Sequence, residues 1–186
     1  AGFPENVLQI LTGRGSVVGE RFVTHPDVAK VVFTGSTEVG IHVAEGCARQ
    51  VKPVTLELGG KSANVIFADS DLEKAAASAP GGVFDNSGQD CCARSRILIE
   101  RSVMDRFLEL LEPAVLGVRV DDPNLTTTDM GPLISAGHRD RVASFVDDKT
   151  NVLIRGSVPE GPGYWYPATV VLAESREDRL LREEIF

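Results

Sequence analysis

The sequence predicts an α/β fold built on a parallel sheet, and three observations lead to this prediction. Short apolar runs rich in β-branched residues alternate with segments of helical pattern along residues 7–58. Two of these runs end in a glycine that is followed by the start of a helix. The order strand, turn, helix, strand is typical of parallel sheets, whose strands are joined by helical crossovers.

The same patterns give an element for most of the chain. The expected strands are 7–11, 27–34, 54–58, 63–67, 97–99, 152–154 and 169–172. The expected helices are 17–23, 38–50, 71–79, 103–111 and 136–147. Ser36 or Thr37 is expected to cap the helix at 38–50, and Ser102 the helix at 103–111. Pro80-Gly81-Gly82 should interrupt the helix before it, because neither residue type favours a helix interior.

Composition and charge exclude several classes of protein. The chain has 27 acidic and 19 basic residues and no basic stripe, so a nucleic-acid partner is not expected. No apolar run reaches the roughly 18 residues of a membrane span. Three cysteines do not make a disulfide scaffold, which favours the reduced cytoplasm. Both ends look interrupted, so we expect a piece of a longer protein.

Two glycine-containing turns follow predicted strands, GRGSVVG at 13–19 and FTGSTEVG at 33–40. Bare glycines and the free N–H groups of a helix start suit the phosphates of a nucleotide. The first turn does not have the spacing of the dinucleotide fingerprint. The alternatives are an ordinary strand-to-helix turn for the first and a helix cap with a glycine for the second.

Glu57 is a carboxylate inside an otherwise apolar strand, within LELGGKS at 56–62. Burial there would raise its pKa toward the range useful for a general base. The alternative is an edge glutamate that faces water or pairs with Lys61.

Cys91 and Cys92 are neighbours within NSGQDCCARSR at 86–96. Such a pair is a poor candidate for a mutual disulfide, and no second pair exists to complete a zinc site, so no metal site is expected. A nucleophilic thiolate fits better, with Arg94 and Arg96 favouring the anion. The alternative is a small buried hydrophobic residue, which is the role expected for Cys47.

Four of these segments occur in a familiar order: FTGSTEVG (33–40), LELGGKS (56–62), GQDCC (88–92) and EEIF (183–186). Together they resemble the successive signatures of the NAD(P)-dependent aldehyde dehydrogenase superfamily, over essentially the whole chain. Glu57 precedes Cys91 by 34 positions, as in that family. The resemblance implies the family's three-layer, parallel-sheet, Rossmann-like fold, incomplete at both ends. Residues 1–59 would be the C-terminal part of the NAD(P)-binding domain, and 60–186 the N-terminal part of the catalytic, thiol-bearing domain.

The resemblance also implies roles for individual residues. Cys91 would be the nucleophile and Glu57 the general base. NAD or NADP would be the cofactor, and Glu184 and Phe186 would contact its nicotinamide ribose and ring. The full set of expected cofactor residues is Gly15, Gly19, Gly35, Ser36, Gly40, Leu58, Glu184 and Phe186. One departure is Pro80-Gly81-Gly82, where the family usually continues a helix toward the cysteine.

The implied activity is oxidation of an aldehyde to a carboxylic acid, through a cysteine thiohemiacetal and a thioester. The glutamate favours hydrolysis of the thioester over transfer to coenzyme A. The family's second oxyanion donor lies upstream of these motifs, so the chain alone is expected to be inactive. The resemblance also implies that the whole enzyme is a homodimer or a homotetramer. The alternatives are a non-catalytic relic or binding module of the same fold, and a cysteine-dependent hydrolase that uses Glu57 without a dinucleotide.

Overall fold

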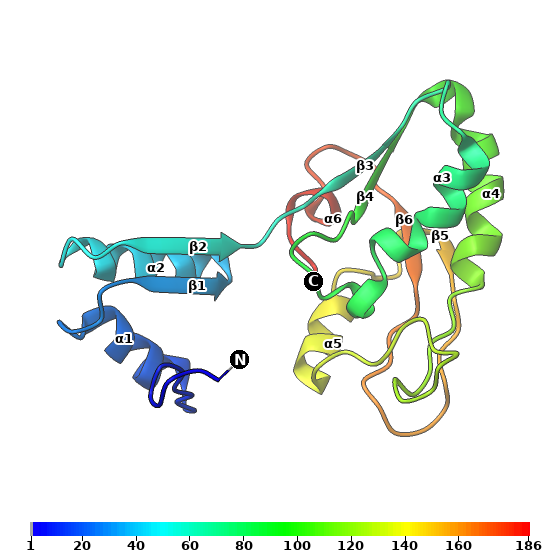
Figure 1. The fold of residues 1–186 in the computed structure, drawn as a ribbon. Coiled ribbons are helices and arrows are strands. Elements are labelled where there is room, and N and C mark those ends of the chain that lie inside the picture. Colours follow the sequence, from blue (N-terminus) through cyan, green and yellow to red (C-terminus); the bar gives the residue numbers. More distant parts are fainter. Residues whose placement is uncertain (1) are drawn as a thin grey trace. The chain divides into compact units, whose positions relative to one another are not determined.

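The computed structural model describes residues 2–186, and the chain divides into two compact units, Ala1–Gly59 and Gly60–Phe186 (Figure 1). The division falls between the two glycines that follow the strand carrying Glu57. Which unit holds the cofactor and which the chemistry remains a prediction. Within the described residues, no helix is both long enough and apolar enough to cross a lipid bilayer.

The first unit is built on a parallel pair of strands joined by a helix (Figure 1). Its elements are η1 (Gly15–Gly19, a π turn), α1 (Glu20–Thr24), β1 (Val31–Gly35), α2 (Thr37–Ala48) and β2 (Val54–Leu58). The register runs from Val31 opposite Val54 to Gly35 opposite Leu58, so both strands end at the same edge. The predicted parallel pairing and the predicted Ser36 cap of α2 are confirmed, since Ser36 Oγ accepts from Val39 N at 3.3 Å.

A small core holds this unit together. Val23, Val43 and Cys47 are buried, and alternate residues of β1 and β2 pack against them. Cys47 is fully buried, as the sequence predicts. Lys52 ties α1 to this core, because its buried ammonium donates to the carbonyls of Phe22, Val23 and His25 at 2.7–3.1 Å. These carbonyls belong to the end of α1, where backbone acceptors lack partners within the helix.

The predicted strand at 7–11 does not form. Its apolar side chains are exposed, with Leu8 at 73% and Ile10 at 82%. A strand needs a neighbour for its backbone hydrogen bonds, and among residues 2–186 this segment has none. The predicted strand at 27–34 is likewise shorter than expected and begins at Val31, where pairing with β2 begins.

The second unit combines two strand pairs with helices (Figure 1). In chain order its elements are β3 (Ala63–Ile66), α3 (Leu72–Ser78), η2 (Pro80–Gly82), η3 (Asp85–Gly88), β4 (Arg96–Ile99), η4 (Arg101–Val103), α4 (Met104–Leu116), α5 (Ala136–Ala143), β5 (Asn151–Arg155), β6 (Thr169–Leu172) and α6 (Arg179–Arg182). Strands β3 and β4 are parallel, whereas β5 and β6 are antiparallel. The strands predicted at 152–154 and 169–172 are confirmed as β5 and β6.

The end of α3 agrees with the prediction, whereas both ends of α4 differ from it. Pro80–Gly82 interrupts α3 as expected, in a short 3₁₀ turn. Ser102 does not cap α4, because it lies within η4 and its hydroxyl donates to Glu100 at 2.7 Å. Helix α4 also continues past Pro113 to Leu116. Pro113 is exposed, so the carbonyl left without a helical donor can bind water.

The core of the second unit is formed around one face of α4. Phe107, Leu111 and Val115 are each at most 1% exposed and recur every four residues. They pack with residues of the neighbouring strands and of α3: Ile66, Ala76, Ala79, Ile154 and Ala168. This apolar face explains why the helix outlasts its proline, since burial of a large apolar side chain contributes about 1.5–3 kcal/mol.

Leu111→Ala should lower the free energy of unfolding of this unit by about 2–5 kcal/mol, because it leaves a cavity in a closed core. The change is measured by urea titration, with the fluorescence of Trp165, the single tryptophan, as the probe. Leu116→Ala is the matched control, because Leu116 lies on the same helix but is 52% exposed, and should cost less than about 1 kcal/mol. Equal losses in the two variants would contradict this description of the core.

Candidate active site

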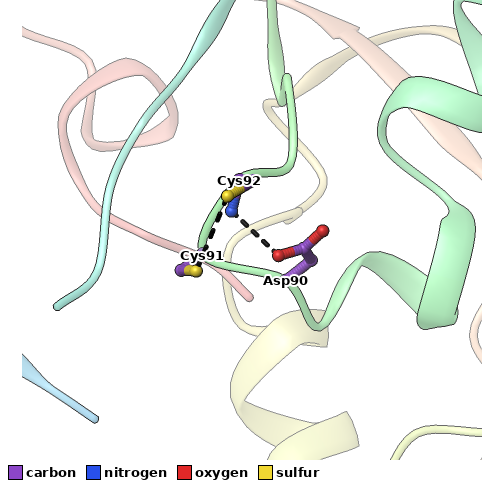
Figure 2. A group of neighbouring side chains, drawn as sticks. All are labelled: Asp90, Cys91 and Cys92. Carbon is purple, nitrogen blue, oxygen red and sulfur yellow. Dashed lines mark hydrogen bonds between the residues drawn. The ribbon is translucent and has the colours of Figure 1, made fainter. Parts of the chain in front are cut away.

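Cys91 lies in the loop between η3 and β4, and its thiol is exposed (Figure 2). The Sγ atoms of Cys91 and Cys92 are 3.8 Å apart and share a thiol hydrogen bond. The backbone N–H of Cys92 donates to Asp90 Oδ1 at 2.9 Å, which folds the carboxylate back over the loop. Among the described residues all three cysteines are free thiols, so Cys91 is available as a nucleophile.

The loop before Cys91 is held in an unusual backbone conformation. Asn86 and Ser87 have φ values of 50° and 59°. These values lie in the left-handed region of the backbone, which residues other than glycine and asparagine rarely adopt. Three hydrogen bonds fix it: Asn86 Nδ2 donates to Gln89 O at 2.9 Å, Ser87 Oγ to Gly131 O at 2.9 Å, and Ile134 N to Gln89 Oε1 at 3.0 Å. The loop is therefore anchored to residues 131–134 despite the glycines of η2.

The electrostatic surroundings of Cys91 differ from the expectation. The hydrogen bond with the Cys92 side chain, and the negative charge of Cys92 when it is a thiolate, raise the pKa of Cys91 above its ordinary value, and Asp90 adds to the increase. The expected lowering by Arg94 and Arg96 is wrong. The Arg94 guanidinium lies against Gly82, where an added Cβ would be 2.4 Å from it. Arg96 lies near Lys61 instead, and together with burial, the larger cause, it lowers the pKa of Lys61.

Gly60 brings two of the predicted site segments together within the second unit. Its backbone N–H donates to Glu184 Oε1 at 3.1 Å. A Cβ at the same residue would lie 3.1 Å from the carbonyl oxygen of Cys91, closer than most real contacts. The acidic residue and the thiol loop thus meet at one glycine, although they are far apart in sequence.

Arg141 of α5 holds the segment that carries Glu184. Its guanidinium donates to the carbonyls of Glu184 at 2.9 Å and Ile185 at 2.5 Å. Phe186 lies 6.1 Å from the His138 ring, edge to face. No sequence pattern indicates Arg141 or His138, because neither belongs to a recognisable motif. The contact at Gly60 had a weak signal in the Gly59-Gly60 doublet.

Glu57 is exposed on the first unit, so the expected burial is wrong and the alternative of a water-facing glutamate holds in this chain. The cause is strand parity. Leu56 and Leu58 face α2 and the small core, so Glu57 between them faces the opposite side. Its partner in the register is Thr34, one residue before the end of β1.

The proposed phosphate-binding residues of the first unit have different local roles. Ser36 starts α2, whose first amides have no partner inside the helix. Gly40 is needed for packing, because a Cβ there would lie 2.5 Å from Leu58 Cδ2, and Gly35 is likewise close to the Phe33 ring. An added Cβ at Gly15 or Gly19 would meet no described atom within 4 Å, so a ligand can approach their backbone closely.

Comparison with known proteins identifies the class. The model of the aldehyde dehydrogenase family matches residues 1–186, and the chain belongs to this family. It is 40% identical to 2-aminomuconic 6-semialdehyde dehydrogenase of a Pseudomonas species, covering 100% of this chain and 40% of that protein. The names of further relatives place them in the cytosol, the chloroplast and the peroxisome.

Solved structures of this family confirm the fold. PnpE in complex with nicotinamide adenine dinucleotide has a TM-score of 0.92 and 38% identity, covering 100% of this chain and 39% of that one. A variant of aldehyde dehydrogenase C from Pseudomonas syringae, in complex with NAD⁺ and octanal, has a TM-score of 0.86 and 30% identity, covering 94% of this chain and 38% of that one. The chain spans about 40% of the length of 2-aminomuconic 6-semialdehyde dehydrogenase.

The Cys91 thiol should become more acidic when its neighbour is removed. Cys92→Ala removes the hydrogen bond between the two thiols, which is the largest cause of the raised pKa of Cys91. The pH midpoint of Cys91 alkylation by iodoacetamide should therefore move to lower pH. Asp90→Asn should move it less, because Asp90 is a smaller cause. Labelling is located by mass spectrometry of the digested chain. Cys47→Ala, a change at a buried site, should leave the midpoint unchanged; an unmoved midpoint in Cys92→Ala contradicts the assignment.

Proposed function

We propose that this chain is part of an enzyme that oxidises an aldehyde to a carboxylic acid with NAD⁺ or NADP⁺. The observation that carries the proposal is the exposed Cys91 thiol, in a loop that meets the Glu184 segment at Gly60. The match to the aldehyde dehydrogenase family supports it, as do the relative named for a semialdehyde and the related structure that contains NAD⁺ and octanal.

In the proposed reaction the Cys91 thiolate attacks the aldehyde carbon and forms a thiohemiacetal oxyanion. Loss of a hydride from that carbon leaves a thioester on the same sulfur. Glu57 then acts as the general base, taking a proton from the water that hydrolyses the thioester to the free acid. The carboxylate of Glu57 is exposed, so a water molecule can reach it and give up this proton to it.

Activation of the thiol supplies little of the catalysis. A thiol with a pKa near 8.5 is only about 3% ionised at pH 7, and the surroundings of Cys91 raise its pKa. Lowering the pKa to about 7 would increase the rate only about threefold, because nucleophilicity falls as basicity falls. Donors directed at the developing oxyanion are worth about 10²–10³. We propose the backbone N–H of Cys91 as one of them.

The described residues fit a dinucleotide. The N-terminus of the twelve-residue helix α2 offers unpaired amides, the Ser36 hydroxyl and the positive end of the helix dipole to a pyrophosphate. Gly15 and Gly19 leave room for close approach, and the Glu184 carboxylate suits the hydroxyls of a ribose. When bound, the nicotinamide accepts the hydride. Gly40 and Leu58 would act by packing α2 on β2, and Gly35 by ending β1 before Ser36. For Phe186 the proposal is contact with the nicotinamide ring.

Two further proposals concern the setting of the enzyme. We place it in the cytoplasm, which the three free thiols and a relative named cytosolic support. We also propose a homodimer or homotetramer as the active form, since closed symmetric assemblies of one chain are the commonest among oligomeric enzymes.

Two variants of the whole protein that carries this chain test the chemical roles. Cys91→Ser should abolish NADH formation. Glu57→Gln should release one NADH per active site in a burst and then stall as thioester, with steady turnover lowered by about 10²–10⁴. Stopped-flow absorbance of NADH measures both phases. Loss of the burst in Glu57→Gln would show that Glu57 acts before hydride transfer and would contradict the assignment.

The 186-residue chain alone should bind aldehyde poorly and show no turnover with NAD⁺, because it covers only 40% of 2-aminomuconic 6-semialdehyde dehydrogenase and 21% of a cytosolic 10-formyltetrahydrofolate dehydrogenase. Assay of the purified chain with a panel of aliphatic and aromatic aldehydes measures this. The whole protein at the same molar concentration serves as the positive control, and sustained NADH formation by the chain itself would contradict the expectation.

A further inference from the structure

Three potential metal ligands meet in the thiol loop. The Sγ atoms of Cys91 and Cys92 and a carboxylate oxygen of Asp90 all lie within 4.8 Å of one another (Figure 2). The sequence argued against zinc because it has no second cysteine pair. The structure supplies a third donor of another kind, the carboxylate next to the pair, which folds over the loop through its bond from Cys92 N.

The spacing of the two sulfurs suits one tetrahedral ion. Two thiolates that each lie about 2.3 Å from a tetrahedral Zn²⁺ are about 3.8 Å apart. The observed distance between the Sγ atoms is 3.8 Å. The Sγ–Sγ distance in a disulfide is about 2.05 Å. The observed distance therefore matches two ligands of one metal ion and does not match a disulfide.

The carboxylate needs only a small adjustment. A carboxylate oxygen and a thiolate on the same tetrahedral zinc are about 3.6 Å apart, and the donor atoms here lie within 4.8 Å. Asp90 Oδ1 accepts from Cys92 N and keeps a second lone pair that is available to an ion. Both cysteines are exposed, and a hollow of about 340 Å³ adjoins Asp90 and Cys92, so an ion can reach the site without unfolding the loop.

We propose that Asp90, Cys91 and Cys92 form a binding site for a thiophilic divalent cation of the zinc class. Two thiolates and one carboxylate neutralise the ion and exceed its charge by one, and a fourth position stays open for water. Binding replaces the two thiol protons with two metal–sulfur bonds and releases both protons to solvent, with no change of oxidation state.

The consequence for catalysis rests on the proposed function. A metal-bound Cys91 sulfur no longer has its lone pair available for an aldehyde carbon, so the cation would inhibit the enzyme in competition with the aldehyde. Binding itself does not depend on dehydrogenase activity. The site is therefore tested by binding to the 186-residue chain, and its failure can be told apart from failure of the proposed function.

Cd²⁺ is the probe, because cadmium thiolates absorb in the near ultraviolet. Titration of the reduced chain should give a thiolate-to-metal band that saturates at one Cd²⁺ per chain, with a large excess of Zn²⁺ competing for the same site. Cys91→Ser and Cys92→Ser should each lose most of the band. Asp90→Asn, which keeps the acceptor for Cys92 N, should weaken binding by about tenfold or more, since even a group that only supports a ligand is worth about 10–100-fold.

Cys47→Ala is the matched control and should keep both the band and the affinity, because Cys47 is buried in the first unit. Absence of the band in the unmodified chain would overturn the proposal, and so would a band that persists in both serine variants. Saturation at one Cd²⁺ per two chains would also overturn it, since the ion would then bridge two molecules.

Discussion

The geometry of the candidate site in the second unit depends on one close backbone contact, that of Gly60 with the Cys91 loop. The space beside Gly60 admits no side chain without displacing the Cys91 carbonyl, and the Gly60 amide holds the Glu184 carboxylate. A larger residue would have to push the thiol loop away by a few tenths of an ångström. The glycine thus joins the turn after β2, the nucleophile and the acidic segment, which Arg141 holds from its other side.

In the first unit the corresponding constraint is the register of two parallel strands. Because Gly35 pairs with Leu58, β1 and β2 end at the same edge of the sheet, next to Ser36 on one strand and Glu57 on the other. Carboxyl ends of parallel strands are where α/β proteins bind their ligands. Strand parity then sends Leu56 and Leu58 to the helix-covered side and Glu57 to the other.

Local patterns were sufficient where the partner of an element lies nearby in the sequence. Strand β2, strand β6 and helix α2 with its Ser36 cap follow from apolar runs, glycines and hydroxyls. The strand expected at 7–11 failed because a strand depends on a neighbour, which no local pattern supplies. Helix α4 is longer than predicted and includes Pro113. Burial of Phe107, Leu111 and Val115 stabilises the helix by more than the proline destabilises it.

The environment of the candidate site could not be predicted from the sequence. Motif order predicts Cys91, Glu184 and Ser36 as site residues, and these roles stay predictions. It could not show that Arg94 turns toward Gly82, that the Cys92 thiol raises the pKa of Cys91, or that Asp90 joins the pair, because these depend on side-chain directions.

We propose that Cys91, and not its neighbour Cys92, carries the acyl group. The most direct measurement is to quench the whole protein during turnover with an isotopically labelled aldehyde and NAD⁺, digest it, and locate the label by fragmentation of the peptide that contains both cysteines. The acyl mass is expected on Cys91 alone. An acyl group on Cys92, or no labelled cysteine at all, would contradict it.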